Sequence, residues 1–424
     1  MNWHGLYSFA SKQALLGLCF EGIERLGEEY PEELKRNPIG RELLMTWMGK
    51  AQQIRRQNMK VNVVAGKLFA MLRVDGMRCC VLKGQGNALM YPNPYSRTPG
   101  DIDVWIDASR ERIMEYAQKK FELEDDIRLQ HLETSLDGVP VELHFFPCSM
   151  NNPIYHARLQ KWFRRNADLQ CSHIVGLPDG AGDIAIPTTA FNVIYQLTHL
   201  YHHFFDEGIG MRQIIDYFLV VNDFSKNVFL NNDLSNHPVP LSKEGSTFSP
   251  SPSSSGSGDV TAPSRCSEPL RSKDGGPSKV SPDCAGWDRL AIEGDNSAGS
   301  TTVVTSSAST ALDVVQKELK YLGLWKFAGA VMYVLHETLG LSEEKMIAPM
   351  DEKRGKLLLA EILNGGNFGK HFTKYGHFTH QGMAKKYFLK IWRNMHFVRY
   401  YPAEALSEPI FRTWHFFWRL KHRR

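Results

Sequence analysis

The stretch that decides the fold is LKGQGNALMYPNPYSRTPGDIDVWID, residues 82–107. It ends in a strictly alternating run, Asp-Ile-Asp-Val-Trp-Ile at 101–106, which predicts a β-strand. Because side chains alternate between the faces of a strand, Asp101 and Asp103 are expected on one face and the aliphatic residues on the core face. Two carboxylates side by side repel each other unless a cation compensates them. Bound Mg²⁺ is the interpretation we favour over solvated acids at an exposed strand end, since Mg²⁺ prefers carboxylates, phosphate oxygens and water.

A further acid of the same kind lies in GVPVELHFF, residues 138–146. Glu142 alternates there with Val141 and Leu143, so its side chain is expected on the face opposite to the aliphatic residues. We expect Glu142 to complete the acidic site; the alternative is a salt bridge to a nearby Arg or Lys. His144 lies on the same face, either as a structural histidine or as part of an acceptor site.

A short apolar run precedes the acidic strand and leads into Lys-Gly-Gln-Gly at 83–86. This pattern predicts a buried strand that enters a tight turn. Backbone N–H groups in such a turn, together with a helix start, suit a phosphate group. The turn is not a Walker motif, but cationic side chains can add charge-assisted hydrogen bonds to a triphosphate. The residues expected to bind phosphate are Lys83, Gly84, Gln85 and Arg97.

Together these features resemble the nucleotidyltransferase fold shared with polymerase-β-type enzymes, in which a Gly-containing turn, an Asp-x-Asp strand and a third acid follow one another. The closer resemblance is to a large, uncharacterised bacterial family of nucleotidyltransferases. It spans most of residues 1–230 and resumes after 311. The matching residues are Leu82-Lys83-Gly84, Tyr91-Pro92, Arg97, Asp101-Ile102-Asp103, Glu142-Leu143-His144, His199, His202, Arg212 and Asp216.

The resemblance implies two-metal phosphoryl chemistry. Asp101, Asp103 and Glu142 would hold two Mg²⁺ ions, and a nucleoside triphosphate such as ATP would transfer its nucleotidyl group to a hydroxyl acceptor with release of pyrophosphate. The candidate acceptor-site residues are His144, His199, His202 and Arg212. One departure concerns the turn, where Gln85 stands in place of the usual Ser and alters the expected contact with the triphosphate.

Two other functions stay open at this stage. The chain could be a catalytically inactive relative that binds nucleotide or acts as an assembly partner, or a toxin-like nucleotidyltransferase that modifies transfer RNA. Three mutually repelling acids favour the enzyme, because an inactive relative has little physical reason to keep them. A net charge of +4, from 50 basic and 46 acidic residues, disfavours a long nucleic-acid acceptor, which needs a basic track. We favour a small acceptor molecule over nucleic acid or protein.

The polar residues of the later helices have a structural explanation as well. His199 and His203 share a helix face, as in zinc-binding helices, but no Glu lies between them and no third ligand is evident. We therefore expect hydrogen-bonded core or acceptor-site histidines rather than a zinc site. Arg212 and Asp216 are four residues apart on a predicted helix and are expected to pair with each other.

The order of predicted elements indicates an α+β protein with a nucleotidyltransferase-like mixed β-sheet core and flanking helices. Asp137-Gly138 predicts a hairpin turn between strands at 127–135 and 139–146. The Ser/Gly/Pro-rich segment buries too little apolar surface to offset its ordering entropy, so we expect a disordered insertion there. The expected regions are an N-terminal helical region, 1–77; a catalytic core, 78–180; the first part of a helical domain, 187–232; the insertion, 233–310; and a C-terminal helical domain, 311–424.

Cysteine usage and hydropathy suggest a cytoplasmic protein. The seven cysteines are scattered and form no Cys-x-x-Cys pair, which indicates reduced thiols and no structural zinc site of that spacing. The start of the chain lacks the pattern of a secretory signal, and no segment is long and apolar enough to span a bilayer. The aromatic, basic stretch at 396–424 is interpreted as a last helix that packs on the core.

Overall fold

The computed structural model describes residues 1–123, 128–236, 311–371 and 383–422. Residues Met1–His237 and Ser309–Arg424 form one structural unit. The predicted disordered insertion lies outside the described residues, apart from its first four. Those four residues, 233–236, belong to a helix that ends at Asn236, so the helical periodicity extends further than the change in composition suggested.

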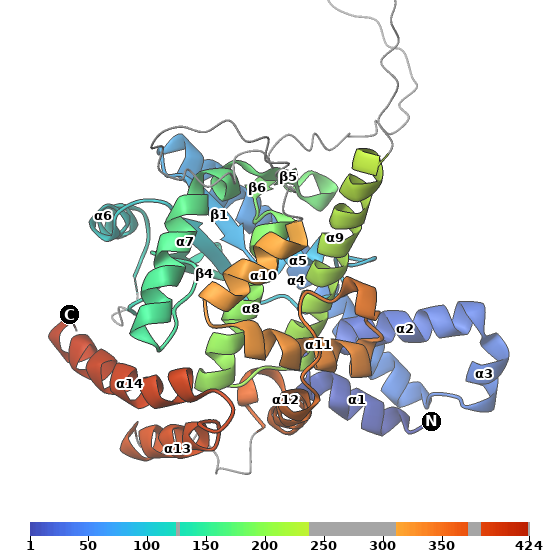
Figure 1. Cartoon of the computed structure of the whole chain (residues 1–424). Helices are drawn as coiled ribbons and strands as arrows, with labels where there is room; N and C mark the ends of the chain where they lie inside the picture. The colour runs from blue at the N-terminus through green and yellow to red at the C-terminus, as the bar shows by residue number, and fades with distance from the viewer. Residues whose placement is uncertain (124–127, 237–310, 372–382, 423–424) are drawn as a thin grey trace, which may run out of the picture. The chain divides into compact units, whose positions relative to one another are not determined.

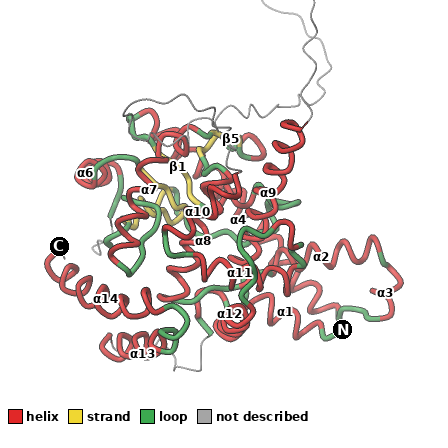
Figure 2. The backbone as a smooth tube through the Cα atoms, viewed as in Figure 1, coloured by secondary structure: helices red, strands yellow, loops and turns green. Residues whose placement is uncertain are grey.

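The core of this unit is a mixed four-stranded sheet, which confirms the predicted α+β class (Figures 1 and 2). The strand order is β1-β2-β4-β3, with β2 parallel to β4 and the other neighbours antiparallel. The strands are β1 Cys79–Leu82, β2 Ile102–Ile106, β3 His131–Leu136 and β4 Val139–His144. A separate two-stranded sheet pairs β5 Ile174–Gly176 with β6 Asp183–Ala185.

Strand β2 is buried on both faces, and its alternation explains how. Ile102, Val104 and Ile106 pack in a hydrophobic cluster that includes residues of the long helix α4 (Arg41–Val74). On the opposite face, Trp105 belongs to a second cluster and its ring lies parallel to that of Phe191, with centroids 6.2 Å apart. Asp103 is therefore a charged residue on a strand whose two faces are both covered by packed side chains.

The predicted hairpin joins β3 to β4 through a two-residue turn. Asp137 and Gly138 have φ values of +49° and +70°, the left-handed pair that a tight hairpin turn requires. The turn sets the register, which pairs Leu136 with Val139 and continues to His131 opposite His144. The hairpin thus places two imidazoles next to each other at the end of the sheet where β4 finishes.

Helices surround both sheets. The chain before β1 is helical, and helices follow again after α9. In the described residues, no helix combines the length and apolar character that crossing a membrane requires. The α-helices not yet given are α1 Trp3–Lys12, α2 Leu16–Glu29, α3 Pro31–Arg36, α5 Gly84–Ala88, α6 Arg110–Lys120, α7 Pro153–Ser172, α8 Thr189–Asp206, α9 Met211–Asn236, α10 Ala311–Tyr321, α11 Trp325–Leu339, α12 Glu352–Gly365, α13 Met383–Met395 and α14 Pro402–His422. The 3₁₀-helices are η1 Pro178–Gly180, η3 Glu343–Lys345 and η4 Asn367–Gly369.

Helix α14 is tied to the residues that precede α7 by a buried carboxyl group. Glu404 is 1% exposed and accepts hydrogen bonds from the backbone N–H groups of Asn151 and Asn152, at 2.5 and 3.2 Å. Burial raises the pKa of Glu404 to about 7, although the two N–H groups oppose that shift. The folded protein therefore holds a proton on Glu404 at pH values at which the unfolded chain has already released it.

This difference predicts a pH-dependent contribution to stability. Because the folded-state pKa is raised, the contribution is largest below pH 4.5 and is lost as the pH rises towards 7. Glu404→Gln, which does not titrate, is expected to remove this contribution. The free energy of unfolding of wild type minus that of the variant should fall by about 2 kcal/mol between pH 5 and pH 8 in urea titrations. A constant difference across this range would show that Glu404 titrates normally.

Candidate functional site

The three predicted acids gather at one end of the sheet. In the parallel pairing of β2 with β4, Asp103 is directly opposite Glu142, while Asp101 precedes the first residue of β2. Asp103 is 5% exposed, whereas Asp101 has an exposed surface although neighbouring atoms partly enclose its carboxyl group. The charge of Asp103, together with burial, raises the pKa of Asp101 to about 6. The acids thus repel one another as the sequence predicted.

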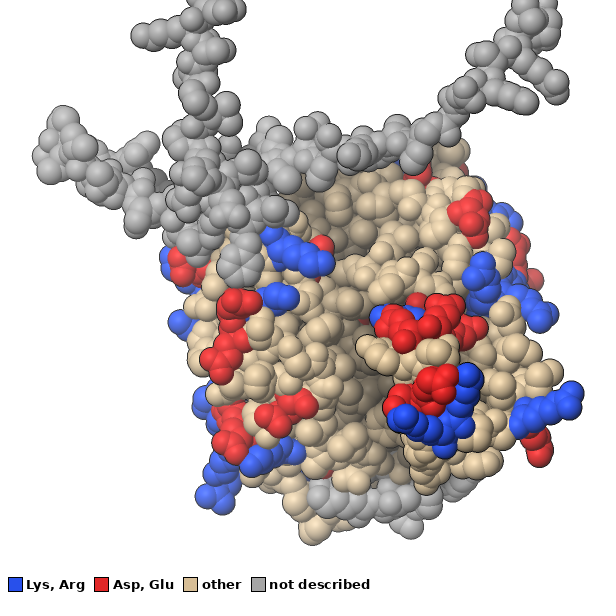
Figure 3. Space-filling model, turned by 90° about the vertical axis from the view of Figure 1, so that its right-hand side faces the viewer, with Lys and Arg blue, Asp and Glu red and all other residues tan. Residues whose placement is uncertain are grey.

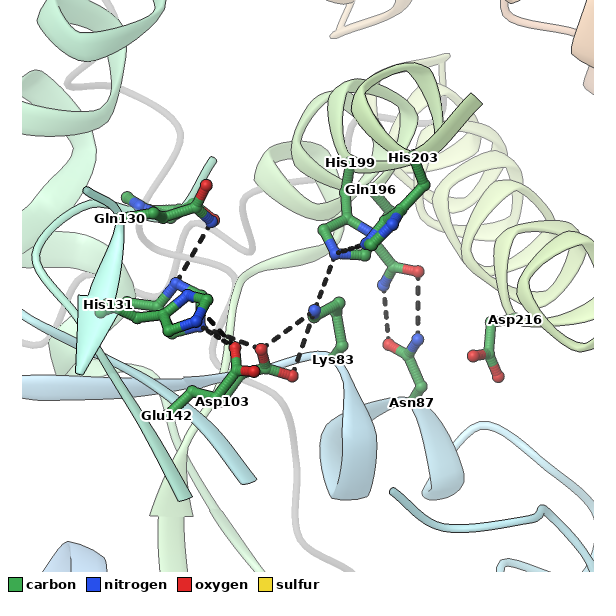
Figure 4. A network of polar contacts seen from close by, with 12 residues as sticks. Lys83, Asn87, Asp103, Gln130, His131, Glu142, Gln196, His199, His203 and Asp216 are labelled. Atoms are coloured by element: carbon green, nitrogen blue, oxygen red, sulfur yellow. Dashed lines mark hydrogen bonds and ion pairs between the residues drawn. The ribbon is translucent and has the colours of Figure 1, made fainter. Parts of the chain in front are cut away.

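Lys83 compensates part of this negative charge (Figure 4). Its Nζ lies 3.1 Å from each carboxylate oxygen of Asp103 and 2.8 Å from Nε2 of His199 on α8. Burial alone would lower the pKa of Lys83, but the charges of Asp103, Asp101 and Glu142 raise it instead, so the ammonium stays charged. Burial would likewise raise the pKa of Asp103, yet Lys83 and His144 hold it well below its usual range.

The turn that carries Lys83 has an unusual backbone. Lys83 adopts φ +53° and ψ −137°, and Gly84 follows at φ +46°. The left-handed region disfavours a side chain such as that of Lys, and strain of this kind concentrates at functional sites. The N–H groups of Gly86 and Asn87 donate to the carbonyl of Lys83, at 3.0 and 3.3 Å. In the described chain, the N–H groups of Gly84 and Gln85 have no such backbone acceptor, so they are the donors the turn can offer to a ligand.

The strain at Lys83 can be tested with a matched pair of variants. Lys83→Ala and Lys83→Gly both remove the ammonium group, but only Gly adopts this backbone conformation without steric cost. We expect Lys83→Gly to be more stable than Lys83→Ala by about 1 to 2 kcal/mol in urea unfolding. Equal stabilities would mean that the turn relaxes to an ordinary conformation when the side chain is lost.

Two histidines face the acids from the other side. Nε2 of His144 lies 3.0 Å from Asp103 Oδ1 and 3.1 Å from Glu142 Oε2. Burial lowers the pKa of His144, but its hydrogen bonds to Asp103 and Glu142 outweigh burial and raise the pKa to about 9. On β3, Nδ1 of His131 lies 3.4 Å from Glu142 Oε2. Burial, aided by the charge of His144, lowers the pKa of His131 to about 3, so His131 is neutral.

A pocket of about 520 Å³, counting its space open to solvent, adjoins the acids. Its position between the turn, β2 and the helices α8 and α9 brings together groups from distant parts of the chain. Its walls combine carboxylates, cations and amides, which suits a polar ligand. The lining residues are Lys83, Gly84, Asn87, Arg97, Gly100, Asp101, Asp103, Gln196, His199, Leu200, Arg212, Gln213, Asp216 and Phe368.

Four of the predicted site residues lie outside this lining. His144 contacts both Asp103 and Glu142, and these contacts belong to the cluster just described. His202 is also on α8 but lies outside the lining, and its Nδ1 is 3.5 Å from the hydroxyl of Ser149. Gln85 is 3% exposed and its side-chain amide donates to Asn62 on α4. The Gln85 side chain therefore turns away from the pocket, and its expected side-chain contact with phosphate is not possible in this arrangement.

The expected pair between Arg212 and Asp216 is wrong. Asp216 instead pairs with Arg97, whose Nε and Nη2 each lie 2.8 Å from a carboxylate oxygen, and Tyr91 donates to the same carboxylate at 2.7 Å. The loop between α5 and β2 brings Arg97 against α9, where this bidentate geometry outcompetes a pair along one helix. Arg97 lines the pocket, but its guanidinium is already engaged.

Unlike Arg97, Arg212 forms no ion pair in the described part of the chain. It donates from Nη1 to the carbonyl of Thr98 at 3.1 Å, and its guanidinium carbon lies 5.6 Å from the ring centre of Phe368. Its Nε is buried and has no hydrogen-bond partner among the described residues. Burial and the charge of Arg97 lower the pKa of Arg212. Arg212 is thus a desolvated cation that faces the pocket.

The sequence analysis missed four polar residues of this region: Asn87, Gln130, His131 and Gln196. Asn87 and Gln196 exchange two side-chain hydrogen bonds, at 3.0 and 2.7 Å, and fix α5 to α8 (Figure 4). A signal for His131 was present, because a two-residue turn at Asp137-Gly138 places it opposite His144 by counting alone. No comparable signal identifies the amide pair, which joins residues 109 positions apart.

The histidines of α8 contact each other and Lys83. Nε2 of His199 lies 3.1 Å from Nε2 of His203, and His199 also contacts Lys83. Burial, with the charge of Lys83, holds the pKa of His199 well below its usual range, so its ring is neutral. His199 thereby serves as a hydrogen-bond partner of the Lys83 ammonium at the pocket wall.

A strained glycine turn, an acidic strand and a third acid on the neighbouring strand thus lie together at one end of the sheet. The chain belongs to a family described as uncharacterised nucleotidyltransferases, whose sequence pattern matches residues 1–235. Membership of this family supports a role in nucleotidyl transfer. No curated protein matches the chain.

Among solved structures, an antigenic nucleotidyltransferase-like protein from Paracoccidioides brasiliensis is similar to part of the chain. The two are 16% identical with a TM-score of 0.27, and the match covers 41% of this chain and 90% of that one.

Proposed function

We propose that the protein transfers a nucleoside monophosphate from a nucleoside triphosphate to a hydroxyl acceptor, with Mg²⁺ as cofactor and pyrophosphate as the second product. The observation that carries this proposal is the register of the parallel pair, which sets Asp103 opposite Glu142 beside Asp101 and the Lys83 turn. Lys83, Asp101 and Asp103 line one pocket, and Glu142 on the neighbouring strand adjoins them without lining it. Convergent acids with strongly shifted pKa values are typical of active sites.

The donor set fits Mg²⁺. Asp101 and Asp103 offer carboxylate oxygens at the pocket wall, and the raised pKa of Asp101 reflects negative charge that a cation would relieve. Asp101 and Asp103 would hold the ions, with Glu142 completing the shell. Bound Mg²⁺ polarises phosphate oxygens and lowers the pKa of an acceptor hydroxyl.

The chain's own residues bind and orient the substrate. Lys83, together with the N–H groups of Gly84 and Gln85, which have no backbone acceptor among the described residues, would bind the phosphates. The acceptor oxygen forms a bond to the α-phosphorus, the bond from that phosphorus to the pyrophosphate oxygen breaks, and the hydroxyl proton passes to Glu142. Lys83 offsets the charge that develops on the departing pyrophosphate.

The acceptor is proposed to be a small hydroxylated molecule. On the face shown in Figure 3, Lys and Arg side chains are interspersed with Asp and Glu and form no continuous basic track of the kind that a long nucleic acid needs. Of the four candidate acceptor-site residues, His199 and Arg212 line the pocket, while His144 and His202 do not. His199, as a neutral ring at the pocket wall, is the better candidate for contact with an acceptor.

Nucleotide binding is the direct test of this proposal. Calorimetry with each of the four nucleoside triphosphates, with and without Mg²⁺, compares wild type with the double variant Asp101→Asn/Asp103→Asn. We expect binding that requires both Mg²⁺ and the two acids. If folded wild type binds none of the four, the chain is better explained as a non-catalytic relative that keeps the fold.

Arg212 is expected to supply the positive charge that the sequence analysis assigned to Arg97. Arg212→Gln removes a desolvated cation that forms no ion pair in the described part of the chain, so stability should change by less than about 1 kcal/mol. The Kd for the triphosphate with Mg²⁺ should rise about tenfold or more, because a charge-assisted hydrogen bond is lost. An unchanged Kd would instead place Arg212 on the acceptor side of the pocket.

A further inference from the structure

We propose that the part of the acidic cluster formed by two histidines and Glu142, next to Asp103, is a site for one divalent first-row transition-metal ion. Its ligands are His131, Glu142 and His144, with Asp103 as the fourth. The site is separate in chemistry from the Mg²⁺ position at Asp101 and Asp103, since two of its four donors are imidazole nitrogens. The inference deepens the proposed function by naming the ion beside Glu142, but it stands on the geometry of these four residues.

The donor atoms have the spacing of ligands around a single ion. Glu142 Oε2 lies 3.4 Å from His131 Nδ1 and 3.1 Å from His144 Nε2, and His144 Nε2 lies 3.0 Å from Asp103 Oδ1. Among the described residues, the ligand atoms of His131, Glu142 and His144 all lie within 4.8 Å of one another. Metal–nitrogen and metal–oxygen bonds of about 2.0 to 2.2 Å at tetrahedral or octahedral angles separate neighbouring donors by about 3.0 to 3.5 Å.

His131 supplies an independent reason to expect a ligand. The residue is 9% exposed and both of its ring nitrogens are buried; Nδ1 lies 3.4 Å from Glu142 Oε2 and Nε2 lies 3.5 Å from Glu133 Oε1, but neither contact has the geometry of a hydrogen bond. A buried polar group without a partner costs free energy, and such groups in native proteins usually mark a role or a bound ion. Nδ1 of His131 points at Glu142, so this nitrogen lies where the other ligands converge.

The mixture of donors selects the class of ion. Mg²⁺ prefers oxygen ligands and near-ideal octahedral geometry, whereas imidazole nitrogen suits Zn²⁺, Co²⁺ and their neighbours. Two imidazoles beside two carboxylates therefore favour a transition metal over Mg²⁺. The burial of the site, with His144 2% exposed, also disfavours an ion that keeps several waters.

The surroundings can adapt to such an ion. Binding at Nε2 of His144 requires the hydrogen on Nδ1, which lies 3.3 Å from the amide nitrogen of Gln130. A half-turn of that amide would present its oxygen to Nδ1–H, and the amide nitrogen could then donate to Ser149, whose hydroxyl now lies 3.3 Å from the Gln130 oxygen. The amide would give up its hydrogen bond to the carbonyl of Pro147. Gln130 then has the role of an outer partner that orients a metal-bound histidine.

Cobalt is a suitable probe because its visible absorption reports nitrogen ligands and coordination number. We expect the full chain, stripped of metal, to bind one equivalent of Co²⁺ in the presence of excess Mg²⁺, and Zn²⁺ to displace it. In the Co²⁺-bound wild type, proton NMR should show two exchangeable imidazole N–H resonances shifted by the paramagnetic ion. His131→Gln should weaken Co²⁺ binding at least tenfold, while His156→Gln, which alters a histidine outside the cluster, should not.

The test separates this inference from the proposed function. Binding of triphosphate with Mg²⁺ is measured on the same samples, and it also shows that each variant is folded. Wild type that binds nucleotide but no Co²⁺, or His131→Gln that binds Co²⁺ as wild type does, would overturn the transition-metal site and leave nucleotidyl transfer intact. Wild type that binds Co²⁺ through two imidazoles but no nucleotide would support the site and count against the transfer reaction.

Discussion

Asp103→Asn is expected to reduce the rate of nucleotidyl transfer by about three orders of magnitude. Asp103 is the acid that contacts both Lys83 and His144, and it lies directly opposite Glu142 in the sheet. The variant keeps the size of the side chain but removes its charge, so the site loses its strongest ligand for a divalent ion. A thousandfold loss corresponds to about 4 kcal/mol of transition-state stabilisation.

Asp107→Asn is the matched control for this prediction. Asp107 follows the other end of β2 and pairs with Arg78 at the surface, so its neutralisation should leave the rate within about twofold of wild type. The rate is measured as pyrophosphate release with saturating triphosphate and acceptor, after circular dichroism has shown both variants to be folded. If Asp103→Asn keeps more than a tenth of the activity, the acids are not the metal site.

Arg97→Met is expected to lower the free energy of unfolding by about 3 to 5 kcal/mol. Arg97 and Asp216 are 5% and 4% exposed and share two hydrogen bonds of 2.8 Å. Removing only the guanidinium leaves a buried carboxylate without its cation, and the desolvation cost of that charge is then uncompensated. Urea unfolding followed by tryptophan fluorescence measures the loss.

The double variant Arg97→Met/Asp216→Leu tests the physical cause. It removes both charges, so it should recover at least half of the stability that Arg97→Met loses. Lys67→Met is the surface control: Lys67 pairs with Asp137 at about half exposure on both sides, and its loss should cost less than about 1 kcal/mol. If Arg97→Met unfolds like wild type but binds triphosphate weakly, Arg97 contacts phosphate as first expected and not Asp216.

Asp103 and Arg97 show which features of the site could be predicted from the sequence and which could not. Asp103 was found because strand periodicity is local: an acid between apolar residues at two-residue spacing is visible in any window of six residues. The same reasoning found Glu142, and the Asp137-Gly138 turn correctly predicted the hairpin that carries it. The ion pair of Arg97 with Asp216 joins residues 119 positions apart, and no local sequence pattern predicts such a contact. For this reason the sequence led us to expect Arg97 to bind phosphate.

The sequence by itself determined the α+β class, the acidic strand, the turn before it and the family, because each of these depends on residue types at short and regular spacing. The tertiary structure alone decided which groups meet. In the tertiary structure β2 pairs with β4 in parallel, so that Asp103 lies opposite Glu142. The side chain of Gln85 donates to Asn62, and Asp216 forms its ion pair with Arg97. The physical reason is that a strand's periodicity specifies which face a side chain takes, whereas its neighbours across the sheet and the pocket follow from packing of the whole core.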